Sequence, residues 1–408
     1  MKVAVIGAGP AGMMAAISAA QAGANVFLLE KNSKLGKKLY ITGKGRCNLT
    51  NDISPQEFLK NVVSNPKFLY SAINRFTPQD TINFFEQFGC PLKVERGGRV
   101  FPLSDRSSDI IKTFEKALNN YGVNVIYDCE VLDINKSSDY FEVLCKNGKN
   151  IISDRVVIAC GGLSYSSTGS TGDGYILSKK FGHTIIDTVP GLVSISVKED
   201  VSSLQGLSLK NVSLSAEYNN KTVSNLFGEM LFTHTGISGP IVLSTSSIIN
   251  RLPLDKVKLF IDLKPALDTN KLDERILRDF SKYQNKQFKN ALIDLLPKSL
   301  IPEIIKRSGI DEDQKVNVIT RMQRQNLINA LKRFELNIQK LDGFERAIIT
   351  CGGVSTKEID PSKLESKLSK GLFFAGEVID VDAYTGGYNI QIALSTGYLA
   401  GINAARAI

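Results

Sequence analysis

The 408-residue sequence lacks several features that would place it in common protein classes. It contains no apolar run of about 18 residues, which argues against a membrane-spanning helix. Its six cysteines are scattered and form no C-x-x-C pair, so a zinc site, a redox disulfide centre and a secreted disulfide framework are all disfavoured. Long low-complexity segments and internal repeats are also missing. We therefore expect an ordered globular protein in the cytoplasm, without a bound metal.

The clearest positive pattern lies in the first thirty residues, MKVAVIGAGPAGMMAAISAAQAGANVFLLE. An apolar strand is predicted over residues 3–6, and a helix is predicted over residues 11–22. Between and within them, Gly7, Gly9 and Gly12 stand at the G-x-G-x-x-G spacing. The first glycine permits a tight turn, the second lets the backbone approach a pyrophosphate, and the third lets the helix lie close to the sheet. The helix N-terminus then offers N–H groups and a partial positive charge to phosphates.

Glu30 ends the second predicted strand, where an acid about 20 residues after the glycine turn binds ribose hydroxyls. Pro10 and the glycines interrupt the apolar run, which disfavours a signal peptide. The segment therefore predicts a dinucleotide-binding site.

Two later segments favour FAD over NAD. Residues 156–162 (VVIACGG) bring a buried strand to paired glycines, and residues 371–401 bring a strand to Gly376 and Glu377 and then open a helix at Gly386 and Gly387. In FAD enzymes the acid after such a strand can bind a ribityl hydroxyl, with Asp380 and Asp382 as weaker alternatives here. The helix N-terminus can face the pyrimidine edge of the flavin. Because the chain has no second G-x-G-x-x-G unit, NAD(P)H is expected to act as a transient electron donor that docks in the substrate cleft.

The sequence predicts an α/β fold with an interrupted Rossmann-type domain. Residues 1–190 and 343–408 form the FAD-binding domain, and the strand at 123–131 with the hairpin at 140–162 suggests a three-stranded β-meander. Alternating apolar and polar runs over 191–268 predict an inserted β-rich domain, and 269–342 a helical subdomain.

The formal net charge is +9. Basic residues concentrate beside the predicted phosphate site, at Lys31, Lys34, Lys37, Lys38, Lys44 and Arg46, and more are spread over 271–333. A solvated basic surface is the ordinary explanation, and recognition of RNA or another polyanion is the alternative.

Six segments resemble one bacterial flavoprotein family. They are GAGPAG, TGKGRCNLTN (42–51), ACGGLSYSSTGSTGDGYILSKKFGH (159–183), LFTHTGISGP (231–240), TCGGVSTKEID (350–360) and FAGEVIDVDAYTGGYNIQIALSTG (374–397). The family includes aminoacetone oxidase, the bile-acid 3-dehydro-Δ-reductase and the flavin-dependent ribosomal-RNA dihydrouridine synthase. The resemblance runs the length of the chain and implies FAD, an inserted β-barrel-like domain, a helical subdomain and a soluble bacterial enzyme. Ala383 departs from the family pattern, which has glycine there.

These segments, together with Glu30, the neighbouring lysines and Val131, supply the candidate cofactor-binding residues: Gly7, Gly9, Pro10, Ala11, Gly12, Glu30, Lys31, Lys38, Gly45, Arg46, Cys47, Asn48, Val131, Ala159, Gly161, Gly376, Glu377, Gly387, Tyr388, Asn389 and Ile390. We expect Arg46 to pair with the pyrophosphate or the flavin O2, and Cys47 and Asn48 to approach the isoalloxazine. A more distant likeness to fumarate-reductase flavoproteins suggests that this glycine-rich loop folds over the flavin. Val131 lies where a meander strand would pass the adenine, although an ordinary core valine is the alternative.

Three residues are candidates for catalysis: His234, Cys47 and Tyr388. His234, one of two histidines, lies in a Thr/Ser/Gly-rich turn and is either a substrate ligand or proton donor, or a loop-stabilising residue. A role for Cys47 as acid or nucleophile competes with a packing role. Tyr388 and Tyr384 are alternative proton donors. His183 follows a predicted helix and is expected to be structural.

The expected reaction is hydride transfer from N5 of reduced flavin to an electron-poor conjugated C=C bond, in an enone or a uracil-type ring. Oxidation of a small amine or amino ketone with O₂ is the enzymatic alternative, and a non-catalytic redox-responsive flavoprotein is the third. The partner is then a small-molecule substrate or ribosomal RNA. By analogy with the rRNA-modifying relatives, the basic segment 271–333 is the expected RNA-docking surface.

Overall fold

The computed structural model describes residues 1–406 and divides into two compact units. Residues 1–191 and the residues from 344 onward form the first unit, and Leu192–Gly343 form the second. The chain leaves the first unit along β12 (Ile185–Gly191) and returns along β19 (Ile349–Val354), and these two strands pair antiparallel. The second unit is therefore an insertion within the first.

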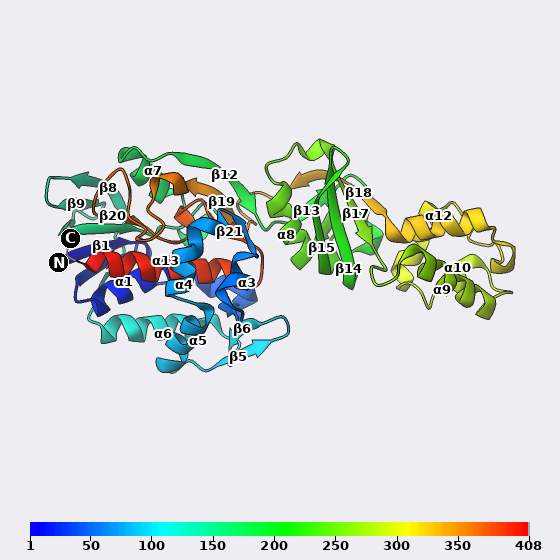
Figure 1. Cartoon of the computed structure of the whole chain (residues 1–408), viewed down its shortest axis with the longest axis horizontal. Coiled ribbons are helices and arrows are strands. Elements are labelled where there is room, and N and C mark those ends of the chain that lie inside the picture. The colour runs from blue at the N-terminus through cyan, green and yellow to red at the C-terminus, as the bar shows by residue number, and fades with distance from the viewer. Residues whose placement is uncertain (407–408) are drawn as a thin grey trace. The chain divides into compact units, whose positions relative to one another are not determined.

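A parallel five-stranded sheet, in the order β20-β11-β1-β2-β7, is the centre of the first unit (Figure 1). Its strands are β1 (Lys2–Ile6), β2 (Asn25–Leu29), β7 (Asn124–Ile126), β11 (Arg155–Ile158) and β20 (Leu372–Phe374). The central strand is apolar and buried from its second residue onward, as in parallel sheets covered on both faces. This arrangement confirms the predicted Rossmann-type α/β fold.

Two buried helices, α1 (Pro10–Gln21) and α13 (Tyr388–Ala405), lie against each other beside this sheet (Figure 1). A Cβ on Gly397 would lie 2.3 Å from the Ala11 carbonyl oxygen, and a Cβ on Gly401 would lie 2.2 Å from that of Ala15. Both contacts advance by four residues in the same direction, so the two helices run parallel. Tyr388 precedes Gly397 by nine positions (397 − 388), so α13 starts about 13 Å beyond the level of the α1 start.

The predicted three-stranded meander is present as β8 (Val131–Lys136), β9 (Phe141–Cys145) and β10 (Asn150–Ser153). The segment 123–131 was expected to be one strand, but its residues 124–126 form β7 of the main sheet and only Val131 belongs to the meander. The end of the expected hairpin, residues 155–158, is β11 of the main sheet.

Shorter elements complete the first unit. Its other helices are α2 (Lys37–Ile41), α3 (Pro55–Leu59), α4 (Tyr70–Arg75), α5 (Pro78–Gln87), α6 (Ser107–Asn120) and α7 (Asp173–Lys180). Two small antiparallel sheets join β3 (Thr50–Asn51), β6 (Arg99–Pro102) and β5 (Leu92–Glu95), and separately β4 (Val62–Ser64) and β21 (Asp382–Ala383). Capping boxes with proline in the first turn begin α3 and α5.

The second unit contains a closed barrel in the order β13-β16-β15-β14-β17-β18. Its strands are β13 (Ile195–Val197), β14 (Ser208–Tyr218), β15 (Lys221–Phe232), β16 (Gly236–Ser238), β17 (Val257–Asp262) and β18 (Phe334–Leu341). Its helices are α8 (Pro240–Ile249), α9 (Thr269–Lys282), α10 (Phe288–Ala291), α11 (Ile301–Ser308) and α12 (Arg321–Lys332). The barrel-like insertion is therefore confirmed.

One strand departs from the prediction. Residues 334–341 were assigned to the helical subdomain, yet β18 closes the barrel by pairing with both β17 and β13. A strand far along the chain completes the barrel, so its role depends on contacts that a local pattern does not contain.

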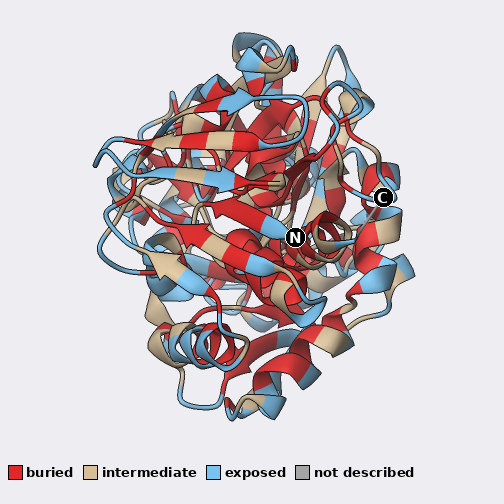
Figure 2. Ribbon diagram, turned by 90° about the vertical axis from the view of Figure 1, so that its left-hand side faces the viewer, coloured by how far each residue is buried: buried red, intermediate tan, exposed pale blue. Residues whose placement is uncertain are grey.

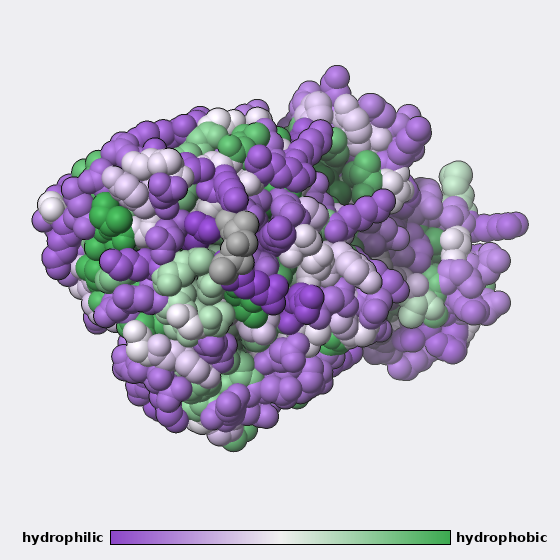
Figure 3. Space-filling view, turned by 60° about the vertical axis from the view of Figure 1, so that its left-hand side comes forward, coloured by the Kyte–Doolittle hydropathy of each residue, from purple (hydrophilic) through white to green (hydrophobic). Residues whose placement is uncertain are grey.

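Buried residues gather in the central strands and helices, and exposed residues lie mainly at the periphery (Figure 2). The face in Figure 3 is mostly hydrophilic, with apolar side chains in small areas. Among the residues described, no helix combines the length and the hydropathy that crossing a membrane requires.

Candidate cofactor-binding site

The turn between β1 and α1 shows why two of its glycines are required. Gly7 has φ +98°, and a Cβ there would lie 2.7 Å from the Ala159 carbonyl oxygen. A Cβ on Gly12 would lie 1.8 Å from the carbonyl oxygen of Gly7. Gly9 differs, because no described protein atom lies within 4 Å of its Cβ position. Gly9 is the N-cap of α1, so open space faces the uncapped N–H groups of this helix. The turn provides a cradle that fits a pyrophosphate.

Glu30 is held against this turn. Its Oε2 accepts a hydrogen bond from the Ala8 N–H at 2.8 Å, and its Oε1 accepts from the Asn32 N–H at 2.8 Å and the Asn32 side-chain amide at 2.7 Å. The side chain is 7% exposed. A carboxylate has about four acceptor positions, so this fixed group retains capacity for ribose hydroxyls.

The structure pairs the two predicted lysines with carboxylates. The Lys31 ammonium lies 2.6 Å from Asp173, and the Lys38 ammonium lies 2.7 Å from Glu377. Lys38 also donates to Ser164 at 2.5 Å. Both lysines thus neutralise acids within the first unit, and their contact with a cofactor stays a prediction.

Glu377 is the centre of a polar cluster. Its Oε1 accepts from the Thr350 N–H at 2.6 Å and from the Ser164 hydroxyl at 3.0 Å, while Oε2 accepts from Lys38. Gly161 approaches the same carboxylate, because a Cβ on it would lie 4.0 Å from Oε2. Ser164 and Thr350 were not predicted, although both lie in segments that carry the family resemblance. The cluster holds the acid in one orientation, as a ribityl-binding group requires.

Gly376 and Ala159 place the Glu377 cluster close to α1. Gly376 has φ +76°, and a Cβ there would lie 2.6 Å from the Cβ of Ala11. Ala159 is buried and donates its N–H to the Ile6 carbonyl at 2.9 Å. The glycine turn, the strand ends and Glu377 therefore meet at one edge of the sheet, the edge at which parallel α/β sheets bind ligands.

The start of α13 is the second helix N-terminus of the site. Its N-cap, Gly387, has φ +91°, and a Cβ there would lie 2.6 Å from the Thr50 carbonyl oxygen. With its amide oriented to satisfy its hydrogen bonds, Asn48 accepts from the Gly387 N–H at 3.2 Å and donates to the carbonyls of Thr50 and Val100. Segments from far along the chain thus brace this helix start.

The first residues of α13 are well anchored. The Tyr388 ring lies edge-on to Phe58 at a centroid distance of 5.2 Å, and burial raises the pKa of the Tyr388 hydroxyl. The Asn389 side chain bonds the Ala383 N–H and carbonyl, which holds the turn before the helix. Ile390 packs against the core. Of these, Tyr388 retains a proton-donor group.

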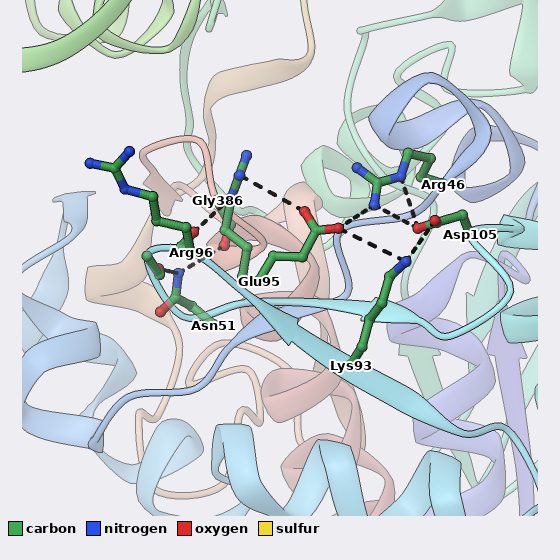
Figure 4. Close-up of polar contacts among 9 residues, drawn as sticks. Arg46, Asn51, Lys93, Glu95, Arg96, Asp105 and Gly386 are labelled. Atoms are coloured by element: carbon green, nitrogen blue, oxygen red, sulfur yellow. Dashed lines mark hydrogen bonds and ion pairs between the residues drawn. The ribbon is translucent and has the colours of Figure 1, made fainter. Parts of the chain in front are cut away.

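The loop 42–48 contains Gly45 with φ +84°; its Lys44 side chain is exposed, whereas Arg46 and Cys47 contact the protein. The Arg46 guanidinium lies 2.5 Å from Glu95 and 2.6 Å from Asp105 (Figure 4). It also lies over the Phe101 ring, 4.3 Å from the ring centroid. Arg46 therefore forms an internal ion network, and its predicted pairing with the pyrophosphate or flavin stays a prediction.

Cys47 is fully buried, and burial raises the pKa of its thiol to about 12. The thiol is protonated at neutral pH, and a buried thiol of this kind is inert. The surroundings favour the packing role over the nucleophilic one.

The two histidines have different environments. His234 lies in the exposed turn between β15 and β16 of the second unit, with Nδ1 3.3 Å from Gln205 Oε1. Its catalytic role stays a prediction. His183 is buried, with Nε2 2.7 Å from the Ser366 hydroxyl and Nδ1 3.3 Å from Glu358, as a structural residue would be.

Val131 begins β8 opposite Cys145 and is 8% exposed. The contact of Val131 with an adenine stays a prediction, and a role as an ordinary core valine is the alternative.

The parallel sheet, the glycine turn with its acid and the second glycine-opened helix define a dinucleotide-binding flavoprotein of Rossmann type. The family model for the HI0933-like protein Rossmann domain matches residues 1–403, and the chain belongs to this family.

Relatives match over nearly the whole length. The chain is 33% identical over 408 residues to the 3-dehydro-bile acid delta(4,6)-reductase of Clostridium scindens, covering 99% of each chain. It is 30% identical over 406 residues to the ribosomal RNA dihydrouridine synthase of Haemophilus influenzae, covering 98% of each. It is 33% identical over 399 residues to the Escherichia coli protein of that name, covering 97% of this chain and 95% of the other. The chain is accordingly an enzyme of the flavin-dependent oxidoreductase class.

Among solved structures, the 3-ketosteroid-delta4-(5alpha)-dehydrogenase of Rhodococcus jostii has a TM-score of 0.53 at 16% identity, covering 99% of this chain and 96% of that one. This likeness concerns the fold.

Proposed function

We propose that the protein binds FAD along the starts of α1 and α13 and reduces a conjugated C=C bond of an enone or a uracil-type ring, with ribosomal-RNA uridine as one such substrate. The observation that carries the proposal is the parallel pair of helices, each opened by a glycine N-cap, with the α13 start about 13 Å beyond that of α1. One N-terminus suits a pyrophosphate and the other the pyrimidine edge of a flavin.

The relatives support this reaction class. One is named a reductase of a bile-acid derivative and two are named ribosomal RNA dihydrouridine synthases. Saturating an enone and converting uridine to dihydrouridine both add two hydrogens to a C=C bond conjugated with a carbonyl. The two reactions therefore share the type of bond that is reduced, whereas the substrates that contain this bond differ.

Bound FAD supplies the redox chemistry, a hydride from N5 of its reduced form. The residues of the chain bind and orient the cofactor. The α1 N-terminus and the space at Gly9 receive the pyrophosphate, Glu30 receives ribose hydroxyls, and Glu377, fixed by Lys38, receives a ribityl hydroxyl. The positive end of α13 stabilises negative charge at the pyrimidine edge.

Reduction also requires a proton at the substrate. Burial and the charge of Glu57 raise the pKa of Tyr388, which keeps its hydroxyl protonated at neutral pH. In our proposal Tyr388 donates to the developing enolate, with Tyr384 as the alternative donor, and NAD(P)H docks transiently as the electron donor.

Anaerobic stopped-flow spectroscopy tests the reaction. NAD(P)H should bleach the flavin absorbance, and an enone steroid or a uridine-containing RNA should restore it while gaining two hydrogens by mass spectrometry. Tyr388→Phe should slow the second step by at least about 100-fold without changing FAD content, and Tyr384→Phe serves as its comparison. Bleaching by a small amine, with no response to NAD(P)H, would identify an oxidase instead.

A further inference from the structure

The β5–β6 hairpin carries arginines on both sides of a tight turn. Glu95 and Arg99 face each other in the antiparallel register, which leaves Arg96-Gly97-Gly98 as the loop. Gly97 and Gly98 have φ +79° and +72°, conformations that glycine adopts without strain. Arg96 is exposed, and the Arg99 side chain is 47% exposed. The Arg99 Nε donates to the Arg96 carbonyl at 3.3 Å, so the turn presents the Arg96 guanidinium and part of the Arg99 guanidinium to solvent.

This turn is tied to the start of α13. The Asn51 side-chain amide donates to the Gly97 carbonyl at 3.0 Å and lies 3.4 Å from the Gly386 carbonyl oxygen (Figure 4). The Asp52 N–H donates to the Gly98 carbonyl at 2.7 Å. One side chain thus joins the arginine turn to the residue before the α13 N-cap, so the turn that carries the two arginines lies beside the proposed flavin end of the site.

Positive charge exceeds negative charge around the hairpin. Glu95 and Asp105 contact Arg46 and Lys93, and Arg99 lies 3.9 Å from Glu95.

Within residues 1–406, Arg96 takes part in no ion pair, and Figure 4 shows its side chain turned away from the Glu95 carboxylate. Its charge is available to a ligand.

The basic segment 271–333 contains both paired and unpaired cations. Among the described residues, no ion pair is formed by Arg278, Lys286, Lys298, Lys306, Lys315 or Arg321. Many of its cations are satisfied by neighbouring carboxylates, in the pairs Arg275–Asp279, Lys282–Asp294, Lys289–Asp313, Arg307–Glu303, Arg324–Asp273 and Lys332–Asp262. Internal pairing reduces the positive field that this segment offers to an external anion. The hairpin is nevertheless the candidate for contact with a substrate anion at the flavin, because it belongs to the same unit as the proposed site and is bonded beside the start of α13.

We infer that Arg96 and Arg99 form a binding site for an oxyanion of the substrate, a phosphodiester or a carboxylate, and so orient the reacting ring at the flavin. This inference rests on the proposed function, because it names the substrate group recognised beside the same site. Guanidinium groups suit these anions, since their planar forked donors bind two oxygens at once.

The test measures equilibrium binding to the oxidised, FAD-loaded protein, so it does not depend on turnover. The phosphodiester probe is the dinucleotide UpU, compared with uridine, and the carboxylate probe is a 3-keto steroid acid, compared with its methyl ester. The variant is Arg96→Gln/Arg99→Gln. The matched control is Arg75→Gln, an exposed arginine on α4.

We expect the double variant to bind one of the two anionic probes at least about tenfold more weakly than the wild type, with its neutral counterpart and the control unchanged. Weakening confined to UpU identifies a phosphodiester, and weakening confined to the steroid acid identifies a carboxylate. If the double variant binds both acids as the wild type does, or if the wild type prefers neither acid over its neutral counterpart, the inference is wrong. Failure of the proposed reaction would instead appear in the stopped-flow experiment, with binding intact.

Discussion

The N-termini of α1 and α13 have the same local structure but are held in place in different ways. Both begin at a glycine N-cap and both leave their first N–H groups without a side-chain cap. The α1 start is built locally, from a turn and an acid within the first thirty residues. The α13 start is instead braced from a distance, by Thr50 and Asn48. The phosphate end of the site therefore depends on a short motif, and the flavin end depends on tertiary structure.

The largest effect should follow from Gly12→Val. Because a Cβ there would lie 1.8 Å from the Gly7 carbonyl oxygen, the helix and turn cannot keep their contact. We expect a loss of about 3 kcal/mol in the free energy of unfolding, together with loss of FAD. Denaturant unfolding and the flavin absorbance of the purified protein measure both. Ala22→Val, at the exposed C-cap of α1, is the control and should retain FAD.

Gly387→Ala perturbs the N-terminus of α13. A residue with a side chain is strained at φ +91°, and its Cβ would lie 2.6 Å from the Thr50 carbonyl oxygen. We expect a destabilisation of about 2 kcal/mol and weaker FAD binding. Gly122→Ala is the control, since it has positive φ with no described atom within 4 Å of its Cβ position. Equal losses in the two variants would show that Thr50 does not brace α13.

Glu377→Gln tests the polar cluster around Glu377, which lies between the proposed phosphate and flavin ends of the site. The Lys38 and Glu377 side chains are 22% and 21% exposed, so solvent screens their attraction in part. Removing the carboxylate charge should cost about 1 kcal/mol of stability and weaken FAD binding about tenfold. A double-mutant cycle with Lys38→Met isolates the pair, and a coupling energy of zero would contradict this assignment.

Cys47→Ala should have the smallest effect at neutral pH. Burial raises the pKa of the folded thiol to about 12, from 9.0. Between these values the unfolded chain loses the proton and the folded chain keeps it, so stability falls as the pH rises through this window. We expect the variant to retain activity from pH 6 to 8 and to lose less stability than the wild type between pH 8 and 10.5. Thermal unfolding at the two pH values measures the second effect, and a large loss of activity at pH 7 would show that the thiol is catalytic.

The local start of α1 could be predicted from the sequence, whereas the contacts that brace the start of α13 could not. The strand, glycine turn, helix and Glu30 were predictable because their spacing is local. The brace at Thr50 was not, because it joins segments far apart in the chain. The same holds for β18, which closes the barrel across a long insertion, and for Arg46, whose carboxylate partners lie on later segments.

Gly397 and Gly401 were predictable only in part. Their four-residue spacing in α13 is visible in the sequence, and small residues at this spacing suit close helix contacts. Their partner helix, α1, is known only from the structure. The pattern could have suggested a close contact but not its location.

The central claim is that FAD lies along the starts of α1 and α13, and the affinity of Gly9→Ala for FAD tests it most directly. Gly9 has φ −76°, and no described atom lies within 4 Å of its Cβ position, so alanine fits the protein itself. Only a ligand at the turn would meet the added methyl group. FAD titration by fluorescence quenching should give at least about tenfold weaker binding than in the wild type, with the unfolding transition of the cofactor-free protein unchanged. Equal affinity in the two proteins would contradict the claim.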